Sequence, residues 1–149
     1  MPLGDSYSYS PTVGGGSGAT YVTSGEGRIT GVRIWELSGN YIRGFQLRYE
    51  YGWTPVIGTN SGDESEMTLF DDEAIIQISG KYTSSYIYSL VFVTSRGRSF
   101  QVGQPTGSSF NFYPTHDGAE LRLLSGRQNG QGITSIGAHW GAFYSNSTH

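Results

Sequence analysis

The pattern Ile-x-x-apolar occurs three times in the sequence, as Ile42-Arg-Gly-Phe45, Ile87-Tyr-Ser-Leu90 and Ile133-Thr-Ser-Ile136. The three copies begin 45 and 46 positions apart. Upstream of each copy an apolar segment is followed by a Ser-Gly pair, at Ser38-Gly39, Ser79-Gly80 and Ser125-Gly126. Repeats at such a period are typical of stacked or ring-closed architectures. Three such units would nearly fill the 149 residues, so the repeat predicts one domain built from three similar units.

The third copy lacks the segment that follows the first two. That segment is Trp53-Thr-Pro-Val-Ile-Gly58 in the first unit and Arg98-Ser-Phe-Gln-Val-Gly103 in the second. Near the N-terminus, Gly18-Ala-Thr-Tyr-Val-Thr23 resembles both. We therefore expect an N-terminal strand to complete the third unit, which brings both ends of the chain to one sheet. Such closure removes the exposed terminal faces that an open array has to cap.

Composition and periodicity predict an all-β fold without helices. Glycine accounts for 23 of the 149 residues, about twice its usual share, which favours many tight turns between short strands. Apolar residues alternate with a period of two, as expected for strands with one buried face. The alternating sets are Val32/Ile34, Phe45/Leu47/Tyr49, Ile76/Ile78, Leu90/Phe92, Leu121/Leu123 and Ile136/Ala138/Trp140. An immunoglobulin-like sandwich is the alternative all-β fold, but it does not predict three units at this spacing.

Neither the charge pattern nor the length of the apolar stretches favours a nucleic-acid-binding or membrane-spanning protein. The chain carries only 9 Lys and Arg residues, scattered along it, and a net charge of −3. Nucleic-acid binding calls for a clustered basic face. No stretch reaches the roughly 18 apolar residues of a membrane span. The absence of cysteine says little about the compartment, because a domain of this size folds without disulfides.

Acidic residues and histidines do not form a pattern typical of a catalytic or metal site. Asp63-Glu-Ser-Glu66 and Asp71-Asp-Glu73 lack the ligand spacing of a calcium loop, and they do not lie on two opposed elements as glycosidase carboxylates do. His116, His139 and His149 show no metal-ligand spacing. The sequence also contains no cysteine nucleophile, no Gly-x-Ser-x-Gly motif and no phosphate loop. We therefore expect no catalysis, no metal and no cofactor.

A series of short motifs follows in order along the chain. They are Gly14-Gly-Gly16, Ile29-Thr-Gly-Val-Arg33, Gly80-Lys-Tyr82, Leu90-Val-Phe-Val-Thr94 with Gly97-Arg98, and Ser125-Gly-Arg127 with Ile136-Gly-Ala-His-Trp140. In this order and spacing they resemble the jacalin-related lectins, most of all the animal zymogen-granule-protein branch. The resemblance implies a β-prism of three four-stranded Greek-key sheets with pseudo-threefold symmetry. It implies a lectin domain at residues 11–143, between a flexible lead at 1–10 and a tail at 144–149.

The resemblance also implies a sugar-binding site, free of metal, at one end of the prism. Three segments would form it: a glycine loop, a recognition loop at 81–86 and a loop at 126–134. The residues expected to contact sugar are Gly14, Gly15, Gly16, Lys81, Tyr82, Tyr86, Asn129, Gly130, Gln131, Gly132, Ile133 and Thr134. Glycines let backbone N–H groups approach sugar hydroxyls closely, and tyrosine rings can cover an apolar sugar face.

The chain departs from the family pattern at Thr134, which stands where the family has an aspartate. A carboxylate accepts strong charge-assisted hydrogen bonds from sugar hydroxyls, and threonine supplies no charge. Three interpretations stay open. The backbone and the amides of Asn129 and Gln131 take over, or the ligand is an extended glycan that spans several loops, or sugar binding has been lost. Likewise, Gly14–Gly16 can be read as a flexible lead-in, and Tyr82, Tyr86 and Tyr88 as residues of a solvated sheet face.

The function expected from the resemblance is recognition of cell-surface, mucin or microbial glycans, as in innate immunity. The alternatives are a glycan-targeting module of a larger, aerolysin-like pore-forming protein, and a prism that contacts protein partners. Pairing of exposed sheets into a homodimer would raise avidity. A secreted protein is favoured, although no signal peptide is visible at residues 1–10. The sequon Asn146-Ser-Thr148 supports secretion only slightly.

Overall fold

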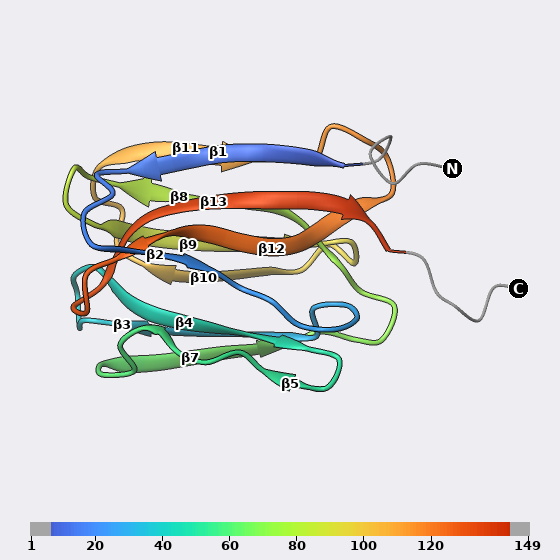
Figure 1. Cartoon of the computed structure of the whole chain (residues 1–149), viewed down its shortest axis with the longest axis horizontal. Coiled ribbons are helices and arrows are strands. Elements are labelled where there is room, and N and C mark those ends of the chain that lie inside the picture. Colours follow the sequence, from blue (N-terminus) through green and yellow to red (C-terminus); the bar gives the residue numbers. More distant parts are fainter. Residues whose placement is uncertain (1–6, 144–149) are drawn as a thin grey trace, which may run out of the picture.

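The computed structural model describes residues 7–143, and every regular element in that range is a β-strand (Figure 1). The strands are β1 (Ser8–Gly14), β2 (Ala19–Val22), β3 (Gly31–Glu36), β4 (Ile42–Tyr49), β5 (Gly52–Trp53), β6 (Ile57–Gly58), β7 (Asp63–Thr68), β8 (Ile75–Tyr82), β9 (Ile87–Thr94), β10 (Ser99–Gly103), β11 (Ser108–Phe112), β12 (Ala119–Gln128) and β13 (Ile133–Ala142). No helix able to cross a membrane occurs within these residues. Most of the expected lead, the expected tail, the sequon and His149 lie outside them.

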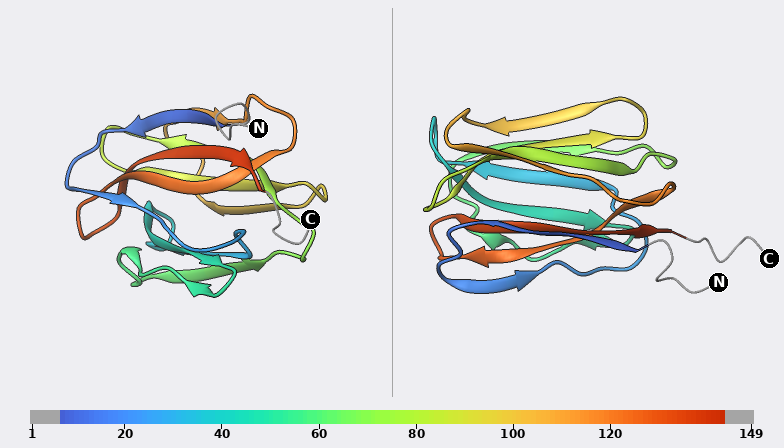
Figure 2. Two further views of the ribbon diagram at one scale, coloured as in Figure 1. Left: turned by 45° about the vertical axis from the view of Figure 1, so that its right-hand side comes forward. Right: turned by 90° about the horizontal axis from the view of Figure 1, so that it is seen from above.

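Three antiparallel sheets make up the prism (Figures 1 and 2). Their strand orders are β1-β13-β12-β2 in sheet A, β5-β4-β3-β7 with β6 also on β4 in sheet B, and β10-β9-β8-β11 in sheet C. In each sheet the first two strands of a unit form the central hairpin, the third pairs with the second, and the fourth returns beside the first. This is the Greek-key order. The predicted all-β prism is confirmed, and sheet B differs only in that two short strands, β5 and β6, share the third position.

Sheet A is completed by two N-terminal strands, β1 and β2. The prediction that the segment 18–23 takes the place of segments 53–58 and 98–103 in the third unit is wrong. Gly14, at the end of β1, pairs with Ser135. Gly58 and Gly103 pair with Gly44 and Ser89 in the same way, each two residues after a repeat isoleucine. The counterpart of segments 53–58 and 98–103 is therefore β1, whereas the segment 18–23 contains β2, a fourth strand. Strand β1 begins three residues before the expected start of the domain.

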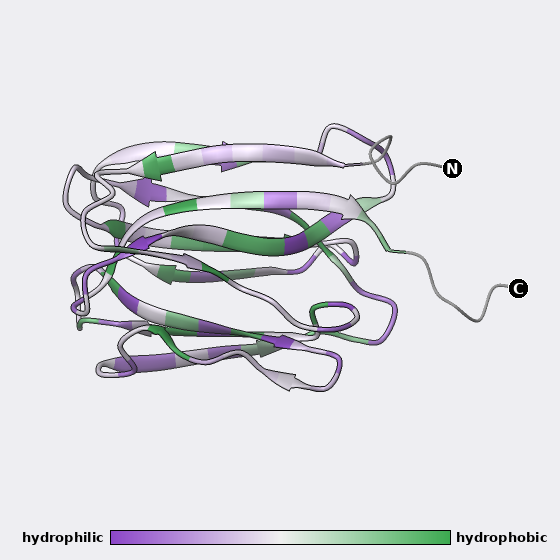
Figure 3. Cartoon of the chain, viewed as in Figure 1, coloured by the Kyte–Doolittle hydropathy of each residue, from purple (hydrophilic) through white to green (hydrophobic). Residues whose placement is uncertain are grey.

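The inner faces of the three sheets enclose one hydrophobic core. The repeat isoleucines Ile42, Ile87 and Ile133 are completely buried, as are the apolar residues three positions later. Trp140 is also fully buried, and its Nε1 donates to Ser10 Oγ at 2.9 Å, which ties β13 to β1. Figure 3 shows hydrophobic residues along β9 and β12, while β7 is mostly hydrophilic. The threefold pattern thus supplies the core.

Two of the predicted alternations fail because of β-bulges. The register shifts directly after Ile75 in the β8–β9 pair and directly after Leu121 in the β12–β13 pair. A bulge inserts one unpaired residue, so the side chains beyond it exchange faces. As a result Ile75 and Leu124 are buried, whereas Ile76 is 38% exposed and Leu123 is only half-buried. A period-two pattern alone cannot reveal such a shift.

Candidate functional site

Three loops gather at one end of the prism, on the left in Figure 1. They are the β1–β2 connection 15–18, the β8–β9 turn 83–86 and the β12–β13 turn 129–132. Asn129 Nδ2 donates to Tyr86 Oη at 3.0 Å, and the Gly16 amide donates to the Thr134 carbonyl at 3.3 Å. The fold therefore brings together parts of all three segments that were expected to form the site.

Gly14 has a conformation that recurs in every unit of the prism. Its φ is +113°, and those of its counterparts Gly58 and Gly103 are +82° and +109°. A Cβ at these three positions would lie 2.3, 2.3 and 2.1 Å from a backbone carbonyl oxygen of the neighbouring strand. Only glycine fits such positions. Gly14 is therefore a structural glycine of the prism, independent of any ligand.

Gly15 and Gly16 have no glycine counterparts, since the other units carry Thr59-Asn60 and Gln104-Pro105 there. A Cβ on Gly15 would lie 1.8 Å from the Ser84 carbonyl oxygen, so glycine allows the loop to touch the turn 83–86. Gly16 has a φ of +76°, but a Cβ there would meet no atom closer than 3.7 Å. Gly15 is thus the glycine that joins two of the gathered loops.

Ile133 and Thr134 are both fully buried, so neither offers an atom to a ligand at the surface. The Thr134 hydroxyl donates to the Ser17 carbonyl at 2.6 Å. Its carbonyl accepts the Gly16 amide, as described above. In place of the family's aspartate, Thr134 therefore fastens the glycine loop to β13. This corrects the expectation that both residues contact sugar.

The turn 129–132 is held by its own side chains. Asn129 Oδ1 accepts hydrogen bonds from the Gln131 and Gly132 amides, at 2.9 and 3.1 Å. The Gly130 amide donates to Gln128 Oε1 at 2.7 Å. Three backbone donors that a sugar was expected to use are thus already bonded within the turn. Gly132 is also buried, whereas Asn129, Gly130 and Gln131 are exposed.

The polar groups left exposed on the three loops are uncharged. Ser17, Ser84, Ser85 and Gln131 are exposed, and the loops themselves contain no ionisable carboxylate, amine or guanidinium. The exposed Arg127 guanidinium, from β12, lies beside them and donates to the Gly18 carbonyl at 3.2 Å. Hydroxyls and a side-chain amide can each donate and accept hydrogen bonds, which suits the hydroxyls of a saccharide.

A tyrosine that the sequence analysis did not single out, Tyr41, stacks on Tyr86. Their ring centroids are 3.8 Å apart and their planes differ by 8°. Tyr88 meets Tyr41 edge-on at 6.4 Å, and a Cβ on Gly132 would lie 2.7 Å from the Tyr41 ring. Burial, followed by the proximity of Tyr86, raises the pKa of Tyr41. The repeat could have revealed Tyr41 in the sequence, because Tyr41, Tyr86 and Gly132 each directly precede a repeat isoleucine.

Lys81 and Tyr82 lie in β8 and are not grouped with the gathered loops. Tyr82 packs against the core, with its ring centroid 6.2 Å from that of Phe110. Lys81 lines a cavity of about 240 Å³ over sheet C, whose other lining residues lie in or next to that sheet's strands. The expected sugar contacts of these two residues are therefore not supported by the geometry.

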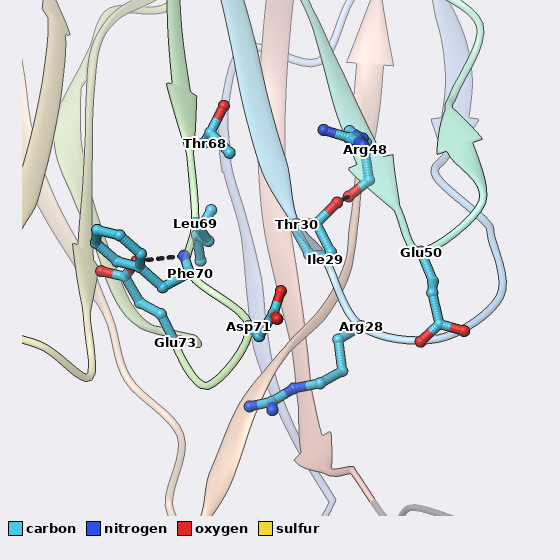
Figure 4. Close-up of a pocket in the computed structure, with 10 residues that line it drawn as sticks. All are labelled: Arg28, Ile29, Thr30, Arg48, Glu50, Thr68, Leu69, Phe70, Asp71 and Glu73. Carbon is cyan, nitrogen blue, oxygen red and sulfur yellow. Dashed lines mark hydrogen bonds between the residues drawn. The ribbon is translucent and has the colours of Figure 1, made fainter.

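A larger cavity, about 390 Å³, lies where β4 and β7 end, on the right in Figure 1, and Figure 4 shows its lining. It is lined by Arg28, Ile29, Thr30, Arg48, Glu50, Thr68, Leu69, Phe70, Asp71 and Glu73. Two of its charged groups are already paired: Arg28 makes a bidentate contact with the buried Glu120, and Glu73 pairs with Arg98. Because these pairs serve the fold, size alone does not make this cavity the better candidate.

The histidine in β13 has a structural environment. His139 Nδ1 shares a hydrogen bond with the Tyr7 hydroxyl, and the Tyr9 ring lies 4.6 Å away. Burial lowers the pKa of His139. Within residues 7–143, no three His, Cys, Asp or Glu side chains form a group that could hold a metal ion.

The family model of the jacalin-like lectin domain matches residues 10–139. The chain belongs to the jacalin-like lectin family. This jacalin-like lectin is 42% identical over 141 residues to zymogen granule membrane protein 16 of Rattus norvegicus, covering 93% of this chain and 83% of the relative. The Homo sapiens protein of that name is equally similar.

Two solved structures show the same fold. The crystal structure of a prostate-specific WGA16 glycoprotein lectin is 32% identical, with a TM-score of 0.81 over 92% of this chain and 100% of that one. The crystal structure of Calsepa lectin in complex with a bisected glycan is 19% identical, with a TM-score of 0.74 over 88% and 95%. At that lower identity the likeness shows the fold alone.

Proposed function

We propose that this jacalin-like lectin binds extended glycans, without a metal ion or a catalytic step, across the loops 15–18, 83–86 and 129–132. The family and its lectin neighbours support a carbohydrate-binding role. The observation that carries the placement is the direct contact of Gly15 with Ser84 and of Asn129 with Tyr86, which joins the three loops into one surface.

The preference for an extended glycan follows from the lack of a carboxylate on these loops. A neutral hydrogen bond contributes about 0.5–1.5 kcal/mol net, and one to a charged group about 1.5–3 kcal/mol. With Thr134 buried and bonded to Ser17, no carboxylate strengthens the contacts to a single sugar. Useful affinity then requires several sugar residues, each contacting a different loop.

The biological setting that fits is recognition of cell-surface, mucin or microbial glycans by a secreted protein, as in innate immunity. Two other roles compete with it. The domain could target a larger pore-forming protein to glycans, or it could bind protein partners. Pairing into a homodimer is a further prediction, which sedimentation velocity of the purified chain tests directly.

A glycan array that includes both monosaccharides and branched oligosaccharides tests the proposal. We expect the wild-type chain to bind oligosaccharides more strongly than their component sugars, and binding to persist in EDTA. Replacing the exposed groups of two loops, with Ser84→Ala and Gln131→Ala, is expected to weaken binding roughly tenfold in total. Gln101→Ala is the matched control, because Gln101 is exposed on β10 in sheet C.

Two results would count against the proposal. If the folded wild-type chain binds no glycan, a protein-binding role becomes the leading function. If binding is strong but unaffected by the Ser84 and Gln131 changes, the glycan site lies elsewhere, and the cavity at the opposite end becomes the next candidate.

A further inference from the structure

We propose that Tyr41 is a positioning residue of the glycan site: it fixes the Tyr86 ring and the turn 129–132 without itself contacting the glycan. The inference rests on the proposed function of the three loops. It assigns to the first unit, which contributes none of these loops, a role in shaping the site.

The threefold repeat explains why Tyr41 reaches this position. Tyr41, Tyr86 and Gly132 each precede a fully buried repeat isoleucine, so they occupy equivalent places in the three central hairpins. The structure brings Tyr41 into contact with both of its equivalents, Tyr86 and Gly132, although they lie 45 and 91 positions further along the chain.

The Tyr41 ring and the Ile42 carbonyl leave room only for glycine at the third equivalent place. A Cβ on Gly132 would lie 2.7 and 2.8 Å from atoms of the Tyr41 ring, and 2.8 Å from the Ile42 carbonyl oxygen. Gly132 has no positive φ that would require glycine on conformational grounds. Packing against the Tyr41 ring and the Ile42 backbone therefore explains its lack of a side chain without a sugar.

The contacts form a closed circuit. Tyr41 stacks on Tyr86, whose hydroxyl accepts from Asn129 Nδ2 at 3.0 Å. The other amide atom of Asn129, Oδ1, accepts from the backbone of Gln131 and Gly132. Gly132 then returns to the Tyr41 ring. The direction in which the exposed Gln131 side chain projects is thus determined in part by Tyr41.

The stack also decides which surface of Tyr86 is available. With centroids 3.8 Å apart and nearly parallel planes, Tyr41 covers one face of the Tyr86 ring. Only the opposite face can meet the apolar face of a sugar ring. Holding a ring and a turn in the bound arrangement before binding reduces the entropy lost on binding, which raises affinity without a new contact.

Substitutions of Tyr41 that keep or remove the ring test this role. Tyr41→Phe keeps the stack, so glycan affinity is expected to stay within about twofold of wild type. Tyr41→Leu removes the stack, and affinity is expected to fall about three- to tenfold. In a Tyr86→Ala background, Tyr41→Leu is expected to lower affinity by a smaller factor than it does alone, because the stack is already lost and only the contact with Gly132 remains to be removed. Tyr51→Leu is the control, since Tyr51 is 80% exposed at the other end.

Amide hydrogen exchange measured by NMR, without any glycan, keeps this inference separate from the proposed function. The Gln131 and Gly132 amides are expected to exchange about three- to tenfold faster in Tyr41→Leu than in wild type, and at the wild-type rate in Tyr41→Phe. If Tyr41→Leu does not fold, Tyr86→Phe breaks the same circuit at the Asn129 bond and should accelerate the same amides.

The inference is overturned if these amides exchange at the wild-type rate in Tyr41→Leu or, where that variant does not fold, in Tyr86→Phe. It is equally overturned if Tyr41→Leu lowers affinity by the same factor with and without the Tyr86 ring. Failure of the wild-type chain to bind any glycan would instead refute the proposed function and leave the exchange result to decide whether the circuit orders the turn.

Discussion

Gly15 and Thr134 show how single residues hold the glycine loop in place. Gly15 has no side chain because the Ser84 carbonyl occupies that space. Thr134 is buried and donates its hydroxyl to Ser17. One residue thus sets the distance to the neighbouring turn, and the other ties the loop to β13. Both effects precede any contact with a ligand.

Gly15→Ala is predicted to separate the glycine loop from the turn 83–86. The added Cβ overlaps backbone, which cannot rotate away, so the free energy of unfolding should fall by about 1–3 kcal/mol and glycan binding should drop strongly. Gly16→Ala is the matched control: its positive φ costs about 1 kcal/mol, but nothing is displaced. Urea denaturation and the glycan array measure both. Equal binding by the two variants would contradict the prediction.

Thr134→Val keeps the shape of the side chain and removes only its hydroxyl. We expect a loss of about 1 kcal/mol in the free energy of unfolding, because the Ser17 carbonyl loses a hydrogen bond. Thr134→Ser retains the donor and should lose less. Faster amide exchange at Gly16 in the valine variant alone would locate the effect in the glycine loop. A valine variant as stable as wild type would show that the bond contributes nothing.

At the scale of elements, the connection between β7 and β8 is pinned by one buried carboxylate. Glu73 is 1% exposed and accepts from the Phe70 amide at 2.9 Å, from Thr94 Oγ1 at 2.5 Å and from Arg98 at 2.5 and 2.8 Å. These hydrogen bonds, those of Arg98 foremost, lower the pKa of Glu73 to about 2 against the opposing effect of burial. The connection is therefore fixed between sheets B and C at neutral pH.

Glu73→Gln is predicted to destabilise the fold at pH 7 by about 2 kcal/mol, since it removes one charge of a partly buried pair whose arginine stays hydrated. The carboxylate's contribution is present above the unfolded pKa of about 4.3 and is lost as pH falls towards about 2. The difference in free energy of unfolding between wild type and variant, measured by urea denaturation, should therefore become smaller as the pH falls through that interval. Asp72→Asn, in an exposed pair with Arg96, should cost little at any pH. A difference that stays constant with pH would contradict the view that the ionised Glu73 carboxylate stabilises the fold.

At the scale of the molecule, the chain closes into a ring of three units. Sheet A takes β12 and β13 from the end of the chain and β1 and β2 from its beginning. Ser8 pairs with Trp140, so the start of β1 lies beside the last residues of β13 (Figure 2). The first and the last of the described strands therefore belong to the same unit, the third.

A circular permutant that joins residue 149 to residue 1 by a Gly/Ser linker, and opens between Asp117 and Gly118, is predicted to fold. The new break falls in the exposed connection between β11 and β12, where no strand pairing is lost. The melting temperature should stay within about 5 °C of wild type by circular dichroism. Opening instead between Val91 and Phe92, inside the central strand β9, should abolish folding. A Gly118 permutant that fails to fold would show that the closure needs the native chain order.

The sequence by itself determined the all-β class, the three units and the closure by the N-terminus. These features follow from the spacing of the repeat isoleucines and from the period-two alternation of apolar residues, both of which can be recognised along the linear chain. The family resemblance then predicted that three loops form a sugar-binding site at one end of the prism. What no linear pattern contains is the pairing register, so the role of β1 and the bulges after Ile75 and Leu121 were missed.

Only the tertiary structure decided which residues of the loops face outward and which hold them together. Thr134 and Ile133 read as sugar contacts in the sequence, but they are buried beneath the loop they support. Tyr41 went unnoticed because its partner Tyr86 belongs to another unit. Burial and stacking depend on distances between units that are far apart along the chain, and these distances exist only after the three sheets have closed.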